Sequence, residues 1–137
     1  MLRADLYEMH YDDSTDEKEK EMLSAKIAED LKTAGTLGEG GALVEFGLHT
    51  YFGEYGFKED NETAWNCCLD ATDMNMAKAW TMIHEMIENN EMPGERPSSE
   101  FLNFCRLMSA RLGDDELLPV LIYNYYKGTM RQYQNEI

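Results

Sequence analysis

The sequence predicts an all-helical protein built from repeated helical hairpins. Apolar residues recur at three- and four-residue spacings in every long segment, as they do along one face of a helix. Ala, Leu, Met, Glu and Lys are common, whereas Val and Ile are scarce, so the composition favours helices and no convincing strand is present. Turn residues also recur, because Gly38, Asn75 and Gly113 lie 37 and 38 residues apart. A period of this length is typical of stacked helical hairpins.

The N-terminal part of the chain precedes the first of these turns. Residues 1–13 are acidic with a few apolar side chains, a pattern compatible with either a short helix or an extended arm. Ser14 is followed three residues later by Glu17, which forms a capping-box pattern. We therefore expect a helix over 16–34, and Gly35 and Gly38 are expected to end it.

Beyond Gly38 the chain alternates between helical patterns and breaks. Asp60 and Ser98 each precede such a pattern and are natural N-caps, and Asp114 is expected to open the last helix. Gly53, Asn90 and Gly128 follow the three turn residues by the same interval, so each is expected to end a helix in a left-handed backbone conformation. The helices expected in this part span 42–52, 60–72, 77–88, 98–112 and 114–127.

Side-chain types repeat in phase with the turns. Cys67 and Cys105 each lie eight positions before a turn residue, which predicts that they are equivalent packing sites and reduced thiols. Small residues precede the turns by four positions, as expected where two helices of a hairpin approach closely. These small residues are Ala34, Ala71 and Ser109, and the apolar residues that follow the turns by four and eight positions are Ala42, Ala79, Leu117, Phe46, Ile83 and Leu121.

The segment 42–79 resembles the Sel1-like repeat, a relative of the tetratricopeptide repeat. It departs from the family pattern by one residue inserted in the Gly-x-Gly turn and by Phe where the pattern has Leu. The second repeat lacks the glycines, with His84 and Asn90 in their places, and the third keeps only its first half. The residues that carry the resemblance are Ala42, Phe46, Gly47, Tyr51, Gly53, Gly56, Phe57, Asp60, Ala64, Ala71, Ala77 and Ala79.

This resemblance implies an all-α fold, a short right-handed superhelix of antiparallel helix pairs of the Sel1-like or TPR-like α-solenoid type. It implies a single domain over 1–137, in which 1–37 form an N-terminal capping segment and helix. Repeats at 38–74 and 75–112 would follow, and 113–137 would form a half repeat and a C-terminal cap. Proteins of such families are scaffolds and adaptors, so the resemblance implies binding of a protein or peptide partner.

Charge and length constrain the partner and the location. Twelve basic residues face twenty-seven acidic ones, which gives a formal net charge of −15. Nucleic acid and anionic membranes are therefore not expected as partners, because phosphate binding requires Lys and Arg. A basic protein partner is compatible with this charge, although acidity also serves solubility alone. No apolar run is long enough to span a bilayer, and the N-terminus has no secretory pattern, so we expect a cytoplasmic protein.

Motifs for catalysis or metal binding are not found in the sequence. His84, Glu85 and Glu88 resemble part of a zinc-protease helix, but the second histidine is missing. The three cysteines lack the spacing of a zinc site. We therefore expect no enzymatic activity, no metal and no cofactor.

Side chains at positions outside the repeat pattern are the candidates for partner binding. On the first helix of each hairpin these positions face a groove or solvent, and apolar residues there are the best indication of a binding surface. The candidates are Glu45, Leu48, His49, Met82, Glu85 and Tyr123.

Three functions remain open from the sequence. The first is a helical-repeat scaffold that binds a protein or peptide. The second is an acidic immunity or inhibitor protein that neutralises a basic toxin or nuclease, since its charge would accelerate association with such a target. The third is an enzyme with no recognisable site.

Overall fold

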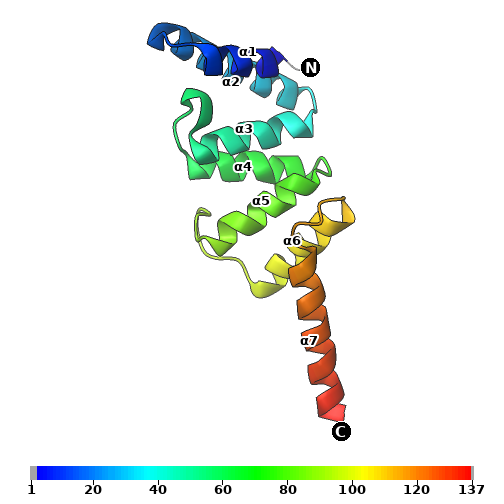
Figure 1. Ribbon diagram of the computed structural model, residues 1–137. Coiled ribbons are helices and arrows are strands. Elements are labelled where there is room, and N and C mark those ends of the chain that lie inside the picture. Colours follow the sequence, from blue (N-terminus) through cyan, green and yellow to red (C-terminus); the bar gives the residue numbers. More distant parts are fainter. Residues whose placement is uncertain (1–2, 137) are drawn as a thin grey trace.

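The computed structural model describes the backbone of residues 3–136 and the side chains of residues 3–128. It contains only helices and turns in this range, which confirms the predicted all-α class. Figure 1 shows the helices following one another down an elongated stack. They are α1 (Arg3–Asp13), α2 (Glu17–Thr36), α3 (Gly40–Phe52), the 3-10 turn η1 (Glu54–Gly56), α4 (Asn61–Thr72), α5 (Ala77–Glu88), α6 (Ser99–Arg111) and α7 (Leu118–Glu136).

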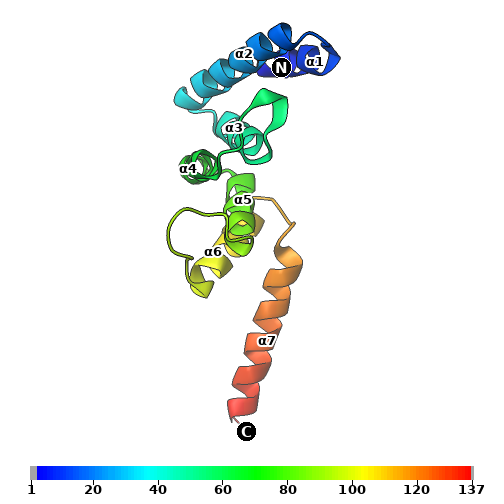
Figure 2. The same cartoon turned by 90° about the vertical axis from the view of Figure 1, so that its left-hand side faces the viewer.

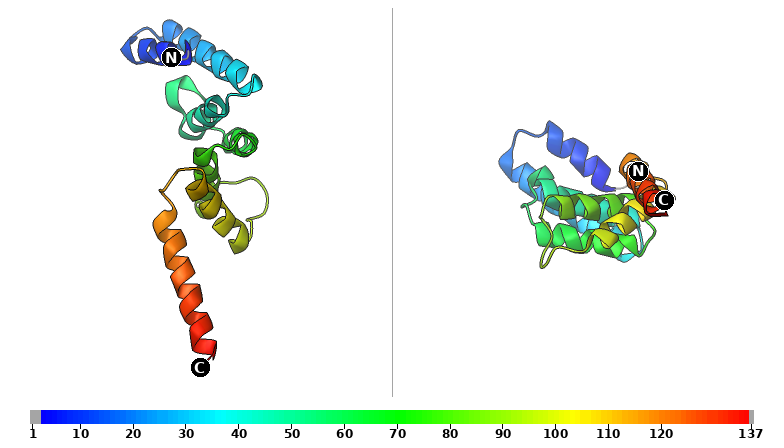
Figure 3. Two further views of the ribbon diagram at one scale, coloured as in Figure 1. Left: turned by 90° about the vertical axis from the view of Figure 1, so that its right-hand side faces the viewer. Right: turned by 90° about the horizontal axis from the view of Figure 1, so that it is seen from below.

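The helices pair as hairpins, and the hairpins stack into a solenoid. Helices α1 and α2, α3 and α4, and α5 and α6 form three successive pairs, and α2 packs on α3 as α4 packs on α5. The two side views agree that α7 differs, because it extends away from the stacked helices (Figure 2 and the left panel of Figure 3). Its main packing partner is α6.

The three turn residues that defined the repeat adopt the left-handed conformation. The φ angles of Gly38, Asn75 and Gly113 are 97°, 57° and 106°. Glycine and asparagine tolerate this region better than other residues, so the same backbone turn recurs at the predicted interval. The recurrence confirms the position of each turn between a hairpin and the next helix.

The first helix of each repeat was predicted to end at a left-handed residue. This prediction is confirmed for two of the three repeats. Gly53 and Asn90 have φ angles of 68° and 55° and follow α3 and α5. The prediction that Gly128 ends the last helix is wrong, because α7 continues without a break to Glu136. A single glycine costs only about 1 kcal/mol in a helix interior, so Gly128 by itself need not end the helix.

Two of the predicted N-caps are confirmed and two are corrected. The Asp60 carboxylate accepts a hydrogen bond from the Thr63 backbone N–H at 3.1 Å, and Ser98 Oγ accepts one from Phe101. Ser14 does not cap α2, because Asp16 occupies that position and accepts from the Lys18 N–H. This places the expected capping box two residues too early.

The second correction concerns Asp114, which does not begin α7. The helix begins at Leu118, and the Asp114 carboxylate instead accepts a hydrogen bond from Thr81 Oγ1 on α5 at 2.7 Å. The Ser109 hydroxyl lies 2.6 Å from the same Thr81 oxygen. This buried polar group fastens the loop after α6 to α5, so Asp114 has a tertiary role in addition to accepting a local hydrogen bond from the Glu116 backbone N–H.

Small residues and cysteines form the contacts between helices. A Cβ atom built on Gly47 would lie 3.2 Å from Cys68 Sγ on α4, so glycine permits α3 to approach α4 more closely than a larger residue would without a shift of the cysteine. Cys68 and Cys105 are buried together with Met82 and Ile83, whereas Cys67 is half-buried against the α2–α3 cluster. All three thiols are free, and burial raises their pKa values, to about 12 for Cys68 and about 11 for Cys105.

Candidate functional site

The residues predicted to bind a partner are divided between the surface and the core. Tyr123 on α7 and Glu85 on α5 are exposed, and Leu48 is half-buried against two core clusters. Met82 is only 2% exposed and packs against Ile83 in the largest core cluster. Its assignment to a binding groove is therefore corrected, because the stacking of α4 and α6 covers this face of α5.

The remaining two candidates, Glu45 and His49, lie together on α3. Glu45 is half-buried and His49 is 5% exposed. Both belong to a compact polar cluster between α1 and α3.

An apolar surface lies at the other end of the solenoid, on α6 and α7. On α7, Leu118, Leu121, Ile122, Tyr125 and Tyr126 recur at helical spacing and form one stripe. A groove of about 430 Å³ runs between this stripe and α6. We call this region the α6–α7 apolar surface. Its exposed residues are Phe104, Leu107, Leu118, Ile122, Tyr125 and Tyr126.

Repeat equivalence explains why this surface is open. Tyr125 occupies the same position after its turn as Thr50 on α3 and Ile87 on α5. Thr50 and Ile87 are 6% and 0% exposed because α4 and α6 complete their hairpins, whereas Tyr125 is 71% exposed. Ile122 is likewise exposed where Gly47 and His84 are buried. Within the described part of the chain, α7 thus presents the face that a second helix covers in the preceding pairs.

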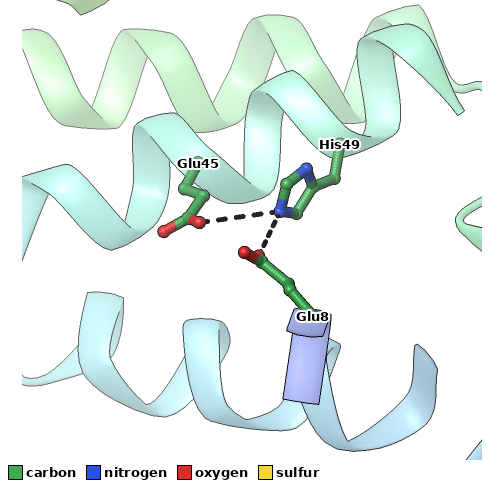
Figure 4. A group of neighbouring side chains, drawn as sticks. All are labelled: Glu8, Glu45 and His49. Carbon is green, nitrogen blue, oxygen red and sulfur yellow. Dashed lines mark hydrogen bonds and ion pairs between the residues drawn. The ribbon is translucent and has the colours of Figure 1, made fainter. Parts of the chain in front are cut away.

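The polar cluster consists of Glu8 from α1 and of Glu45 and His49 from α3 (Figure 4). Glu45 and His49 share one face of the helix because they are four residues apart. His49 Nε2 lies 2.7 Å from Glu8 Oε1 and 3.8 Å from Glu45 Oε1. The side chains of Glu8 and Glu45 are only partly exposed, so the two carboxylates and the imidazole meet in a largely enclosed space.

Aromatic rings and backbone geometry fix the imidazole. Tyr55, in the η1 turn, has a φ of 53° and presents its ring edge-on to the His49 ring with a centroid distance of 4.8 Å. Phe57 makes a similar contact at 5.4 Å. A non-glycine residue in the left-handed region costs on the order of 1 kcal/mol, which the contacts around Tyr55 must offset. His49 Nδ1 is buried without a hydrogen-bond partner among the described residues, and the nearest carboxylate oxygen, Glu54 Oε1, is 3.6 Å away.

The pKa values of the Glu8 and Glu45 carboxyl groups are both raised. Burial, then the hydrogen bond and the negative charge of Glu8, raise the pKa of Glu45 to about 7, although His49 acts in the opposite direction. Burial also raises the pKa of Glu8, with further contributions from Asp5 and Asp12. The cluster therefore concentrates acidic groups in an environment that disfavours their charge.

His84 on α5 sits in a different environment from His49. Its Nε2 accepts a hydrogen bond from the Arg106 Nε–H at 2.9 Å, and Arg106 also approaches Glu88. Burial and the adjacent Arg106 cation lower the pKa of His84. The lone pair that a metal would need is thus already engaged.

Comparison with known proteins identifies the architecture. No protein-family model matches the chain, and no curated protein sequence matches it. A solved Sel1 repeat protein from Oxalobacter formigenes superposes with a TM-score of 0.65 over 76% of this chain, at 22% sequence identity. The chain has the Sel1-like repeat fold. It spans 41% of the length of that solved protein.

The Sel1-like register accounts for the core and leaves the polar cluster unexplained. The positions of Glu45 and His49 are occupied by Met82 and Met86 in the second repeat and by Val120 and Asn124 in the third. Glu8 lies outside the repeats, 41 residues from His49 in sequence. The four-residue spacing of Glu45 and His49 was the only sequence signal of this cluster, and it gave no indication of the third member.

The part of the chain that the structure describes contains no helix long and apolar enough to cross a membrane.

Proposed function

We propose that this Sel1-like protein is a non-enzymatic interaction module, and that its α6–α7 apolar surface binds an amphipathic helix of a protein partner. The observation that carries the proposal is the uncovered face of α7. In α3 and α5 the equivalent face is packed against the second helix of the hairpin, and the same packing is available to a helix from another protein. A partner helix with apolar residues at three- and four-residue spacings would fit the stripe.

The composition of the surface supports this proposal. Two adjoining grooves, which share Leu107 and Tyr125, are lined by two aliphatic and three aromatic side chains of this surface: Phe104, Leu107, Ile122, Tyr125 and Tyr126. Aromatic residues contribute strongly to binding because they bury a large area with little loss of side-chain entropy. An exposed apolar cluster of this kind is typical of an interaction site rather than of an inert surface.

The charge of the protein indicates the character of the partner. With a net charge of −15, association with a basic protein is accelerated at low salt, and nucleic acid is disfavoured. Tyr123 and Glu85, both exposed, are retained as proposed contacts of such a partner. The single domain with its half repeat from 113 is part of the proposal, as is a cytoplasmic location, where the three free cysteines would stay reduced.

The test compares partner capture by matched variants. Ile122→Glu places a charge in the groove, whereas Leu37→Glu places the same charge at an 80% exposed position far along the chain. Each variant must retain the helical circular dichroism of the wild type. We expect a partner captured from the native cell to be lost with Ile122→Glu and retained with Leu37→Glu. Equal capture by both variants would overturn the proposal.

A second candidate function is inhibition of a basic toxin or nuclease, in the manner of an immunity protein. The observation that favours it is the excess of twenty-seven acidic over twelve basic residues. Such an inhibitor would bind through its charged surface, so its capture of the target would fall steeply with added salt and survive Ile122→Glu. The first candidate predicts that capture is lost with Ile122→Glu, and that it falls less steeply with salt because apolar burial is insensitive to moderate salt.

A further inference from the structure

Glu8, Glu45 and His49 lie close together, although the repeat fold does not require this cluster. We infer that these three side chains form a binding site for one divalent transition-metal ion of the Zn²⁺ type, which joins α1 to α3. The inference is independent of the proposed partner surface, which lies at the other end of the solenoid.

The geometry of the donor atoms fits a single ion. One donor atom from each of the three residues lies within 4.8 Å of the other two. In a tetrahedral zinc site with ligand distances of about 2.0–2.1 Å, donor atoms are separated by about 3.4 Å. The observed separations from His49 Nε2, 2.7 Å to Glu8 and 3.8 Å to Glu45, lie on either side of this value. Small side-chain rotations are sufficient to reach it, and the fourth position is left for water.

The unpartnered nitrogen of His49 is the second observation. A neutral imidazole carries one N–H group. If Nε2 holds the hydrogen and donates it to Glu8, then Nδ1 directs a lone pair toward the Glu54 carboxylate, 3.6 Å away, and remains unsatisfied. A metal on Nε2 moves the hydrogen to Nδ1, where it points toward Glu54. Metal-bound histidines commonly donate their other N–H to a carboxylate in this way.

The surroundings of the cluster also favour a cation. Asp5, Asp12 and Glu54 act electrostatically on Glu8 in addition to Glu45. Among the described residues, the ion pairs of Glu8, Glu45 and Glu54 all go to His49. A divalent cation would balance the two ligating carboxylates without moving the helices.

The donor set selects the type of metal. Imidazole nitrogen suits Zn²⁺, Ni²⁺ and Cu²⁺, whereas Mg²⁺ and Ca²⁺ prefer oxygen ligands alone. We therefore expect Zn²⁺ and its spectroscopic substitute Co²⁺ to bind, and millimolar Mg²⁺ to have no effect.

The experiment titrates the full chain, freed of metal by chelation, with Zn²⁺ in a calorimeter and with Co²⁺ in a visible spectrophotometer. The wild type should bind one equivalent of Zn²⁺, and Co²⁺ should give absorption bands of a nitrogen- and oxygen-ligated ion. His49→Gln and Glu45→Gln should each weaken Zn²⁺ binding at least tenfold. Glu54→Gln, which replaces the charged acceptor proposed for Nδ1–H with a neutral amide oxygen, should weaken it roughly 10-fold or more.

Two control variants separate this site from adventitious binding. His10→Gln removes an exposed histidine of α1 that lies outside the cluster, and Cys67→Ser removes the half-buried thiol. Both should bind Zn²⁺ with the affinity of the wild type. Glu45→Gln conserves size, so it keeps the test valid if His49→Gln fails to fold. No stoichiometric binding by the wild type, unchanged binding by Glu45→Gln, or loss of binding with Cys67→Ser would each overturn the inference.

Discussion

Gly47 on α3 and Cys68 on α4 are in such close proximity that a Cβ atom on the glycine would lie 3.2 Å from the cysteine sulfur. The same Cβ would lie 3.4 Å from the backbone oxygen of Ala64. The cysteine side chain would have to shift slightly to accept a Cβ atom, and any larger side chain would also meet the backbone of α4. The distance between these two helices is therefore set by the absence of a side chain at position 47.

Replacement of Gly47 tests this relationship directly. Gly47→Leu should destabilise the protein by roughly 1–3 kcal/mol or more, because its branched side chain overpacks the α3–α4 interface. Urea unfolding followed by circular dichroism measures the loss. Gly41→Leu is the matched control on the same helix, since a Cβ there meets only Met76 Cε at 3.8 Å. If both variants lose the same stability, close packing is not the function of Gly47.

The reactivity of the cysteines is a second consequence of the packing. Burial raises the pKa of Cys68 to about 12 and of Cys105 to about 11, so neither forms a thiolate at neutral pH. In the folded protein, iodoacetamide should modify only the half-buried Cys67, and slowly, because burial raises its pKa as well. Mass spectrometry before and after addition of urea counts the modified thiols. Rapid modification of all three without urea would contradict the packing described for α4 and α6.

The sequence predicted the parts of the fold that depend on local backbone chemistry. Gly38, Asn75 and Gly113 were recognisable because only a few residue types tolerate the left-handed turn between stacked hairpins. Asp60 and Ser98 were recognisable because a capping side chain bonds within three residues of itself. Asp114 was misplaced because its partner, Thr81, lies 33 residues earlier and has no local signature.

The polar cluster could not be predicted for the same reason. Glu45 and His49 share a helix face, but Glu8 is brought to them only by the docking of α1. The expectation that His49 is exposed failed because Tyr55 and Phe57, from the turn after α3, cover its ring. A contact between distant segments decided the first outcome, and the conformation of the turn after α3 decided the second.

The Thr81–Asp114 hydrogen bond gives a third prediction. Asp114→Asn keeps the shape but replaces an ionised acceptor, while Thr81→Val removes the buried donor, so that the carboxylate loses this hydrogen bond and retains the one from the Glu116 backbone N–H. Thr81→Val should cost about 1–3 kcal/mol of unfolding free energy, because hydrogen bonds to charged groups are stronger than neutral ones. Asp115→Asn, in the same loop, is the control and should change stability little. A double-mutant cycle between positions 81 and 114 with no coupling energy would show that the bond does not fasten the loop.

The polar cluster makes the stability of the metal-free protein depend on pH. Burial, and then the hydrogen bond and charge of Glu8, raise the pKa of Glu45 to about 7, whereas a carboxyl group in the unfolded chain titrates near 4.5. Between these values the folded state binds more protons than the unfolded state, so the free energy of unfolding falls as pH rises. The full shift would correspond to about 3 kcal/mol for a deeply buried group, and partial exposure of Glu45 reduces the expected loss to about 1 kcal/mol.

Urea unfolding in a chelating buffer from pH 5 to pH 8 measures this dependence. Glu45→Gln, which remains neutral, should flatten the decline and make the variant more stable than the wild type at pH 8. Glu85→Gln alters an exposed glutamate on α5 and should leave the slope unchanged. An identical slope for the wild type and Glu45→Gln would mean that Glu45 is ionised across this range in the folded protein.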